Sequence, residues 1–443
     1  MSADYKDTAK SSPKPSDNVT PPQSKTTSAA YYSLGVLTIV YSFNFIDRQL
    51  LAILQEPIKA DLGLSDSHLG LLTGFAFAAF YVTAGIPIAR WADRANRRNI
   101  VALAVFIWSF MTSISGLAQN FVQLLFARIG VGVGEAGGSP PSHSIISDIF
   151  PVEKRATAMG LYSSGVSIGI LFGFLLGGWL NEFFGWRVAF VVVGLPGILL
   201  AIIVRFTMDE PERGQSESRK ASSTQASLRE VFSVLWNRHS FRYLSIGAAL
   251  NAFAGYATAN WIASFMIRSH SMTTGELGTW LAAILGLGGA IGMISCGYLS
   301  DKLGKTDKRW YMWTPMLALL IGIPFNIAAF TVESKYVALM CLIIPGIVIN
   351  SFLGNVIAMT HGLVGLGMRA TASAALFFII NIIGLGLGPW SVGILSDILT
   401  PSLGSSALGT ALLYIVPPIM ALAAISFYAA SRQLRADLAL APD

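Results

Sequence analysis

Twelve apolar runs follow one another along the chain and are separated by polar segments. Each run reaches the roughly 20 residues that a helix needs to cross about 30 Å of hydrocarbon. We place them at 30–55, 67–90, 99–118, 120–147, 156–181, 186–206, 240–267, 276–299, 311–332, 336–362, 370–396 and 406–430. The pattern predicts an all-α membrane protein with twelve transmembrane helices.

Polar stretches divide this pattern into parts. Residues 1–28 are rich in Ser, Pro, Thr and Lys and read as a disordered N-terminal tail. Residues 207–238 form the one long polar interruption, which we expect to be a central loop. We therefore predict a first six-helix bundle over 29–206, a second over 239–431, and a C-terminal tail over 432–443.

The composition supports lipid as the main solvent. Of the 443 residues, 53% are hydrophobic and 12% are charged, whereas soluble proteins carry about 25% charged residues. The mean hydropathy is +0.60, and 43 glycines suit helices that approach closely in lipid. Cys296 and Cys341 both lie inside apolar runs, and we interpret them as small hydrophobic side chains.

The positive charges predict an orientation rather than a nucleic-acid partner. The net charge is +6, but Lys and Arg lie in short clusters between apolar runs and not on one basic face. The clusters fall on one side of the predicted membrane, which places both termini and the central loop in the cytoplasm. The opposite side offers little beyond Lys59, Arg187, Arg268 and Lys335. The compact loops suggest a multi-pass protein of a bacterial inner membrane.

Two local sequences recur at an offset of about half the chain. ARWADRANRR at 89–98 follows the second run, and GYLSDKLGK at 297–305 follows the eighth. RATA opens the fifth run at 155–158 and the eleventh at 369–372. Two matches in register predict two halves that arose by duplication.

These loops resemble the signature of the major facilitator superfamily, Gly-x-x-x-Asp-Arg/Lys-x-Gly-Arg/Lys-Arg/Lys. The first copy departs from it at Ala89 and Asn96, where glycine is usual, and we expect Asn96 to tolerate a left-handed backbone at a helix end. The resemblance implies the twelve-helix fold in two pseudo-symmetric bundles.

The first run contains the polar sequence NFIDR at 44–48. A charge near a helix centre costs about 2.5–3.5 kcal/mol on insertion scales, so Asp47 and Arg48 require an explanation. Our interpretation is that they line a polar cavity together with Asn44. The alternative is that they neutralise one another in part or lie nearer the outer interface.

The fourth run contains RIGVGVGEA at 128–136, followed by Pro140 and Pro141. The glycines should let a neighbouring helix approach, and the prolines should weaken the backbone hydrogen bonds. We interpret Glu135 as a group that binds and releases a proton as Arg48 or Arg128 moves relative to it. The alternative is a buried packing carboxylate satisfied by Arg128.

Charges in the repeated loops form the third polar region. We interpret them as a cytoplasmic gate whose members pair in one conformation and separate in the other; they are Asp93, Arg94, Arg97, Arg98, Asp148, Asp301 and Lys302. The alternative is that they are ordinary charges of a cytoplasmic loop.

The combined motifs resemble the Spinster-type branch of the superfamily. NFIDR at 44–48, RIGVGVGEA at 128–136, DIFP at 148–151, RATAMG at 155–160 and EPERG at 210–214 carry this resemblance. The animal members of this branch move sphingolipids and lysophospholipids, including sphingosine-1-phosphate. The resemblance implies roles in proton coupling and headgroup sensing for Asp47, Arg48 and Glu135.

We therefore expect a secondary transporter that works by alternating access on an amphipathic anion and is coupled to or modulated by protons. The alternatives are a drug–proton antiporter, a small-carboxylate symporter and a non-transporting membrane sensor. The candidate substrate-binding residues are Arg48, Asn44, Arg128, Tyr256, Asn260, Trp261, Asn355, Phe377 and Asn381. No Walker motif, zinc-ligand spacing or nucleophile elbow occurs, so we expect no enzyme activity, no cofactor and no metal. We expect the protein to act as a monomer.

Overall fold

The computed structural model describes residues 27–214, 228–365 and 368–440. In these ranges the chain makes twelve helical passes, six in each half. The passes of the first half are α1 (Ser28–Ile53); α3 (Asp66–Gly70), η1 (Leu71–Phe75) and α4 (Ala76–Ala92); α5 (Arg97–Ser115); α6 (Phe121–Glu135) and α7 (Ser139–Ile149); α8 (Val152–Phe184); and α9 (Trp186–Thr207).

The second half repeats this arrangement. Its passes are α11 (His239–His270); α12 (Thr274–Leu281), η2 (Ala282–Leu287) and α13 (Gly288–Gly304); α14 (Trp310–Thr331); α15 (Lys335–Val348) and α16 (Leu353–Gly362); α17 (Arg369–Ile379), η4 (Ile380–Leu387) and α18 (Gly388–Leu403); and α19 (Ala407–Ala439). The shorter elements are α2 (Gln55–Leu62) after the first pass, α10 (Leu228–Trp236) before the seventh, and the 3-10 turn η5 (Gly404–Ser406) before the last.

Within the described residues, nine stretches are long and apolar enough to cross a membrane by length and composition. The eleventh and twelfth passes run together as one of these stretches, Thr371–Ala439. The fourth pass is not among these nine stretches, because its two helices, α6 and α7, are each shorter than 18 residues. The seventh, α11, is long but carries polar side chains such as Asn251, Thr258 and Ser264.

Three helices extend into segments predicted to be tails or loops. Helix α1 begins at Ser28, where the hydroxyl of Thr27 accepts a hydrogen bond from the backbone N–H of Ala30. Helix α10 lies within the predicted central loop, and α19 continues to Ala439. Most of the predicted N-terminal tail, residues 1–26, lies outside the described residues.

The expected role of Asn96 is wrong. Its φ is −70° and its ψ is 112°, so its backbone is extended and not left-handed. Its side chain accepts a hydrogen bond from the backbone N–H of Asn99 at 2.9 Å. Asn96 therefore caps the start of α5 and satisfies one of the free N–H groups there.

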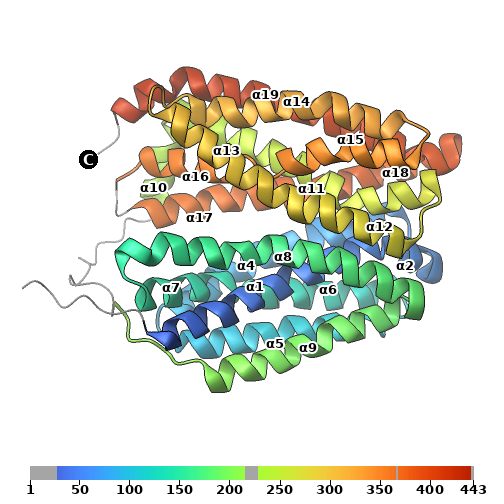
Figure 1. Ribbon diagram of the computed structural model, residues 1–443, viewed down its shortest axis with the longest axis horizontal. Helices are drawn as coiled ribbons and strands as arrows, with labels where there is room; N and C mark the ends of the chain where they lie inside the picture. The colour runs from blue at the N-terminus through green and yellow to red at the C-terminus, as the bar shows by residue number, and fades with distance from the viewer. Residues whose placement is uncertain (1–26, 215–227, 366–367, 441–443) are drawn as a thin grey trace, which may run out of the picture.

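The two halves lie side by side with their long helices roughly parallel (Figure 1). Contacts between α8 and α12 and between α3 and α18 join the halves. Gly178 of α8 and Gly278 of α12 make this approach possible, because a Cβ on either glycine would lie 3.1–3.2 Å from the Cα of the other. Helix α1 begins and α19 ends at the same end of the molecule (Figure 1), as an even number of passes requires.

Candidate functional site

Four ionisable side chains of α1 and α6 form two crossed ion pairs in the first half. The guanidinium of Arg48 donates from Nε to Glu135 Oε2 at 2.8 Å, and its Nη2 lies 2.7 Å from the same oxygen. Arg128 Nη1 lies 3.4 Å from both carboxylate oxygens of Asp47. Each helix thus contributes one acid and one base, and Glu135 pairs with Arg48 rather than with Arg128 of its own helix.

Glycines of α6 let its neighbours come close enough to enclose these pairs. A Cβ on Gly134 would lie 2.7 Å from the backbone nitrogen of Trp108 on α5, and one on Gly132 would lie 3.1 Å from the carbonyl oxygen of Phe77 on α4. The pass is interrupted between Glu135 and Ser139, as Pro140 and Pro141 predicted. Glu135 is therefore the last residue of α6, beside a break in the backbone hydrogen bonds.

Aromatic rings surround the Arg48 guanidinium. Its central carbon lies 5.1 Å from the ring centre of Phe45, 4.8 Å from that of Phe77 and 5.2 Å from that of Tyr81. Its side chain is 13% exposed, whereas that of Glu135 is fully buried. Arg48 is thus a cation that is held by one carboxylate and is also accessible from one side.

One polar atom in each ion pair has no hydrogen-bond partner. Glu135 uses Oε2 only, and its buried Oε1 is unpaired; the buried Nε of Arg128 is also unpaired. Within the described residues, the hydrogen bonding of both ion pairs is therefore incomplete.

A central cavity lies between the halves next to Arg48. Its polar lining includes Gln49, Thr73, Arg128 and Asn350, and most of its other lining residues are apolar. Several lining residues belong to the π-helical segments: Thr73 lies on η1, Leu285 on η2, and Ile380, Asn381 and Leu385 on η4. Such segments widen a helix locally and are frequent at functional sites.

The structure brings six of the nine predicted substrate-binding residues to this cavity: Arg48, Arg128, Tyr256, Asn260, Phe377 and Asn381. Three others lie elsewhere. Asn44 is buried within the first half, and the indole N–H of Trp261 donates to the carbonyl oxygen of Pro389 at 2.7 Å. Asn355 donates to Ser300 at 2.8 Å and to Thr314 at 2.9 Å, so its amide joins three helices of the second half.

Sequence reasoning missed the aromatic rings around Arg48 and the polar lining residues Gln49, Thr73 and Asn350. Gln49 directly follows the NFIDR sequence and could have been found there. Phe77 and Tyr81 lie on the second pass, with no local feature that distinguishes them from other apolar residues of that helix.

The predicted gate charges fall into two groups. Arg97 is buried and joins three segments: it pairs with Asp148, and it donates to Glu210 Oε1 at 2.8 Å and to the carbonyl oxygen of Pro211 at 2.7 Å. The backbone N–H of Arg98 donates to Glu210 Oε2 at 2.8 Å. These bonds lie within the first half and fasten the chain after α9 to α5 and α7.

The remaining gate candidates lie on the surface. Asp93, Arg94, Asp301 and Lys302 are exposed. The hydroxyl of Tyr311 donates to Asp301 at 2.7 Å, again within one half.

Comparison with known proteins gives the same result as the fold. The profile of the Major Facilitator Superfamily matches residues 37–389. An MFS-type efflux pump of Mycolicibacterium smegmatis is 34% identical over 412 residues, which are 92% of this chain and 94% of that protein. The sphingosine-1-phosphate transporter SPNS2 of Danio rerio is 25% identical over 400 residues, 84% of this chain and 77% of that protein.

A solved structure is also similar along nearly the whole chain. It is a bacterial homologue of the human lysosomal transporter Spinster in an inward-facing and unoccupied conformation, with a TM-score of 0.83 and 35% sequence identity. The match covers 93% of this chain and 98% of that one. The chain therefore belongs to the Major Facilitator Superfamily of membrane transporters and is similar to the Spinster-type members of that superfamily.

Proposed function

We propose that the protein is a secondary active transporter that carries an amphipathic anion, such as a lysolipid or sphingolipid phosphate, by alternating access coupled to protons. The observation that carries this proposal is the lining of the central cavity. One accessible cation, Arg48, lies beside a wall that is mostly aliphatic and aromatic. A phosphate would bind the guanidinium fork, and an alkyl chain would occupy the apolar wall.

One group of sequence relatives supports this proposal. SPNS2 of Danio rerio is named as a sphingosine-1-phosphate transporter, which is an amphipathic anion of this kind. A sugar acid or another small, highly hydroxylated anion would need several hydrogen-bond partners around it. The cavity offers such partners as Gln49, Asn350 and Asn381, but most of its wall is apolar, and this larger apolar part supports the amphipathic class.

Coupling to protons follows from competition for Arg48. While Glu135 is ionised, its Oε2 accepts two contacts from the guanidinium. Fewer N–H groups of Arg48 are then available to bind an anionic headgroup. Protonation of Glu135 weakens this pair and frees Arg48 for the anion. By linkage, anion binding raises the proton affinity of Glu135 to the same extent.

The orientation and the gate belong to the same proposal. The loops that carry Arg94, Arg97 and Arg98 would face the cytoplasm of a bacterial inner membrane, as would both chain termini. We propose that the exposed Asp93, Arg94, Asp301 and Lys302 pair when that side closes, while the buried Arg97 stays bonded within its half. A monomer suffices, since the central cavity is lined by both halves of one chain.

Uptake by proteoliposomes with an imposed pH gradient tests the function. A lysolipid phosphate should accumulate in the proteoliposomes. Its uptake should depend on the pH gradient more strongly than the uptake of a neutral lipid with the same tail. Accumulation of a dicarboxylate or a cationic drug instead would identify one of the alternatives. Movement of none of these solutes, from protein that is folded and inserted, would favour a non-transporting sensor.

The variant Glu135→Gln tests the proton step. The substitution keeps the shape of the side chain but removes its titration, so transport should lose its dependence on pH while the protein stays folded. Exposed Glu153→Gln on α8 is the matched control and should behave as the parent. Proton-driven uptake that persists unchanged in Glu135→Gln would remove this residue from the mechanism.

A further inference from the structure

A short helix at the end of the molecule where α19 ends presents exposed aromatic side chains (Figure 1). This helix is α10, which precedes the seventh pass. We propose that α10 lies in the bilayer surface and that Arg238 and Arg242 beside it bind the phosphate of an anionic phospholipid. None of these residues lines the central cavity, so the proposal depends neither on the transported substrate nor on the direction of transport.

One face of α10 is fixed by the core of the second half. Val231 and Leu235, one helical turn apart, are fully buried in that core, and α10 contacts α11 and α17. The side chains of Phe232 and Trp236 are 45% and 42% exposed, and their rings stack with centres 5.4 Å apart. The helix therefore holds a pair of aromatic rings outward on a fixed support.

The order of the faces around α10 fits a membrane surface. Successive residues of a helix point about 100° apart, so the aromatic pair lies between the buried face and the exposed polar residues Ser233 and Asn237. Aromatic side chains are enriched at membrane interfaces, and a helix that lies on a membrane has one apolar and one polar side. We therefore assign lipid, rather than water, as the solvent of Phe232 and Trp236.

The next exposed apolar side chains along the chain belong to a membrane pass. Tyr243 and Ile246 are exposed on the first turns of α11, and neither lines the central cavity. Exposed apolar side chains of a membrane pass that lie outside the cavity contact lipid. The aromatic pair of α10 therefore lies where the lipid-facing surface of the second half begins.

Two arginines beside the aromatic pair keep N–H groups free. Arg242 donates from Nε to the carbonyl oxygen of Trp236, and its central carbon lies 5.7 Å from the centre of that ring. Arg238 donates from Nη2 to the carbonyl oxygen of Leu440. Within the described residues neither guanidinium pairs with a carboxylate. Both therefore have N–H donors left for an anion from outside the protein.

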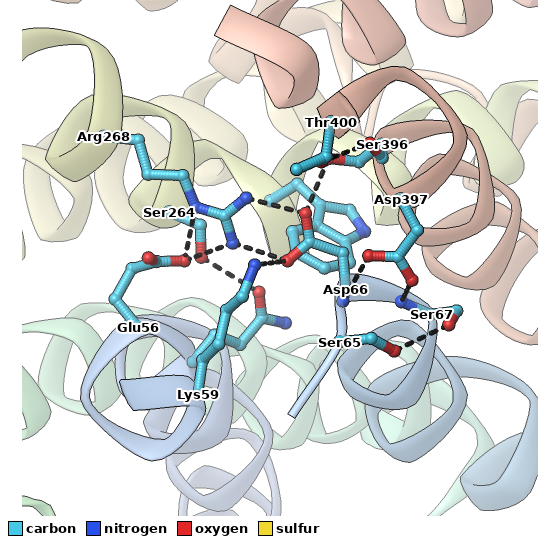
Figure 2. Close-up of polar contacts among 12 residues, drawn as sticks. Glu56, Lys59, Ser65, Asp66, Ser67, Ser264, Arg268, Ser396, Asp397 and Thr400 are labelled. Carbon is cyan, nitrogen blue, oxygen red and sulfur yellow. Dashed lines mark hydrogen bonds and ion pairs between the residues drawn. The ribbon is translucent and has the colours of Figure 1, made fainter. Parts of the chain in front are cut away.

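An arginine at the opposite end of the molecule shows the contrast. There Arg268 binds the carboxylates of Glu56 and Asp66 (Figure 2), whereas the charges of Arg238 and Arg242 are not compensated in this way. A guanidinium binds a phosphate with two parallel hydrogen bonds, and each basic residue near a bilayer strengthens its attraction to anionic lipids. An anionic phospholipid supplies both the phosphate and acyl chains for the aromatic rings, which a soluble phosphate does not.

Quenching of Trp236 fluorescence by brominated lipids tests the site. The purified full chain is placed in nanodiscs of equal parts phosphatidylglycerol and phosphatidylcholine, with bromine on the acyl chains of one lipid or the other. The contribution of Trp236 is the difference between the parent and Trp236→Phe. Bromine on the anionic lipid should quench this contribution at least about twofold more than bromine on the zwitterionic lipid. Arg238→Gln combined with Arg242→Gln should remove that preference, whereas lysine at both positions should keep part of it, because the charge remains.

Arg205→Gln is the matched control, since Arg205 lies near the end of α9 with its central carbon 5.5 Å from the ring centre of Phe206. This variant should keep the parental lipid preference at Trp236. If Trp236→Phe does not give monodisperse protein, Trp236→Tyr supplies the difference in its place.

Three outcomes would overturn the proposal. Equal quenching by the two brominated lipids in the parent would remove the phosphate site, and quenching by neither would mean that α10 lies outside the bilayer surface, open to water or covered by a protein partner. A parental preference in the folded double glutamine variant, or its equal loss in Arg205→Gln, would remove the two arginines from the site. The assay requires no transport, so failure of the proposed function would be seen separately in the uptake experiment.

Discussion

At the scale of single residues, the central feature is a cation that one carboxylate binds and that is also accessible from the central cavity. Arg48 is bound by Glu135 on one side and faces the cavity on the other, with three aromatic rings around it. The faces of the rings attract the guanidinium. A charge in such surroundings interacts with an anion more strongly than a charge in bulk water does.

Replacement of Arg48 by alanine should weaken binding of an anionic amphiphile about 10- to 100-fold, because a hydrogen bond to a charged group contributes about 1.5–3 kcal/mol. Binding of a neutral lipid with the same tail should change far less. Calorimetric titration of the purified protein measures both. Arg48→Lys should recover part of the affinity, and equal losses for the anionic and neutral ligands would instead indicate a structural role.

The presence of these charges could be predicted from the sequence, but the choice among their possible partners could not. An ionisable residue within an apolar run stands out locally, as Asp47, Arg48 and Glu135 do. Which acid meets which base depends on how α1 and α6 are rotated against each other, and that is a property of packing. The sequence left both Arg48 and Arg128 open as partners of Glu135, and the structure pairs Glu135 with Arg48.

At the scale of helices, glycine positions and π-helical segments shape the site. Gly132 and Gly134 set the distance from α6 to α4 and α5, and with it the position of Glu135. The π-segments η1 and η2 occur at equivalent places of the second and eighth passes, which follows the duplication seen in the loop motifs. The eleventh pass contains another π-segment, η4, in a stretch that is rich in glycine: Gly384, Gly386 and Gly388.

Gly134→Ala should displace α6 from α5, because the new Cβ would lie 2.7 Å from the backbone nitrogen of Trp108. Overpacking of this kind costs about 1–3 kcal/mol, so the melting temperature and the proton-driven uptake should both fall. Gly85→Ala on α4 is the control, since a Cβ at this position would have no atom within 4 Å apart from those of its own helix. A Gly134→Ala protein with parental melting and uptake would contradict the close-packing role of this glycine.

At the scale of the whole molecule, the charges divide between two ends. Lys59, Arg268 and Lys335 form ion pairs at the end of the molecule where α2 lies (Figure 1). The repeated loops with Arg94 and Lys302 lie at the opposite end, where α1 also begins (Figure 1). Between these ends lies the central cavity, which residues of both halves line, as substrate sites at the interface of two repeats do.

Cysteine labelling in intact cells tests the orientation. Leu117, between α5 and α6, is 69% exposed, and Arg94, between α4 and α5, is exposed as well. In a cysteine-free background, a membrane-impermeant maleimide should label Leu117→Cys from outside but should reach Arg94→Cys only after the cells are opened. The reverse pattern would invert the proposed topology and place the termini outside.

The sequence by itself determined the features that depend on local hydrophobicity and spacing. The length of each apolar run indicated the twelve passes, the polar interruption and the repeated motifs divided them into two halves, and isolated charges marked Asp47, Arg48 and Glu135. Each of these features can be read from neighbouring residues, because the preference of a segment for lipid or water is a sum over its own side chains.

The tertiary structure alone decided which residues meet. It paired Arg48 with Glu135, brought Tyr256, Asn260 and Asn381 to the cavity, and left Asn44, Trp261 and Asn355 outside it. It also joined Asp66 to Arg268, 202 residues further along the chain. Such contacts depend on how whole helices rotate, break and pack against one another. The hydrophobic periodicity within one segment cannot predict that arrangement.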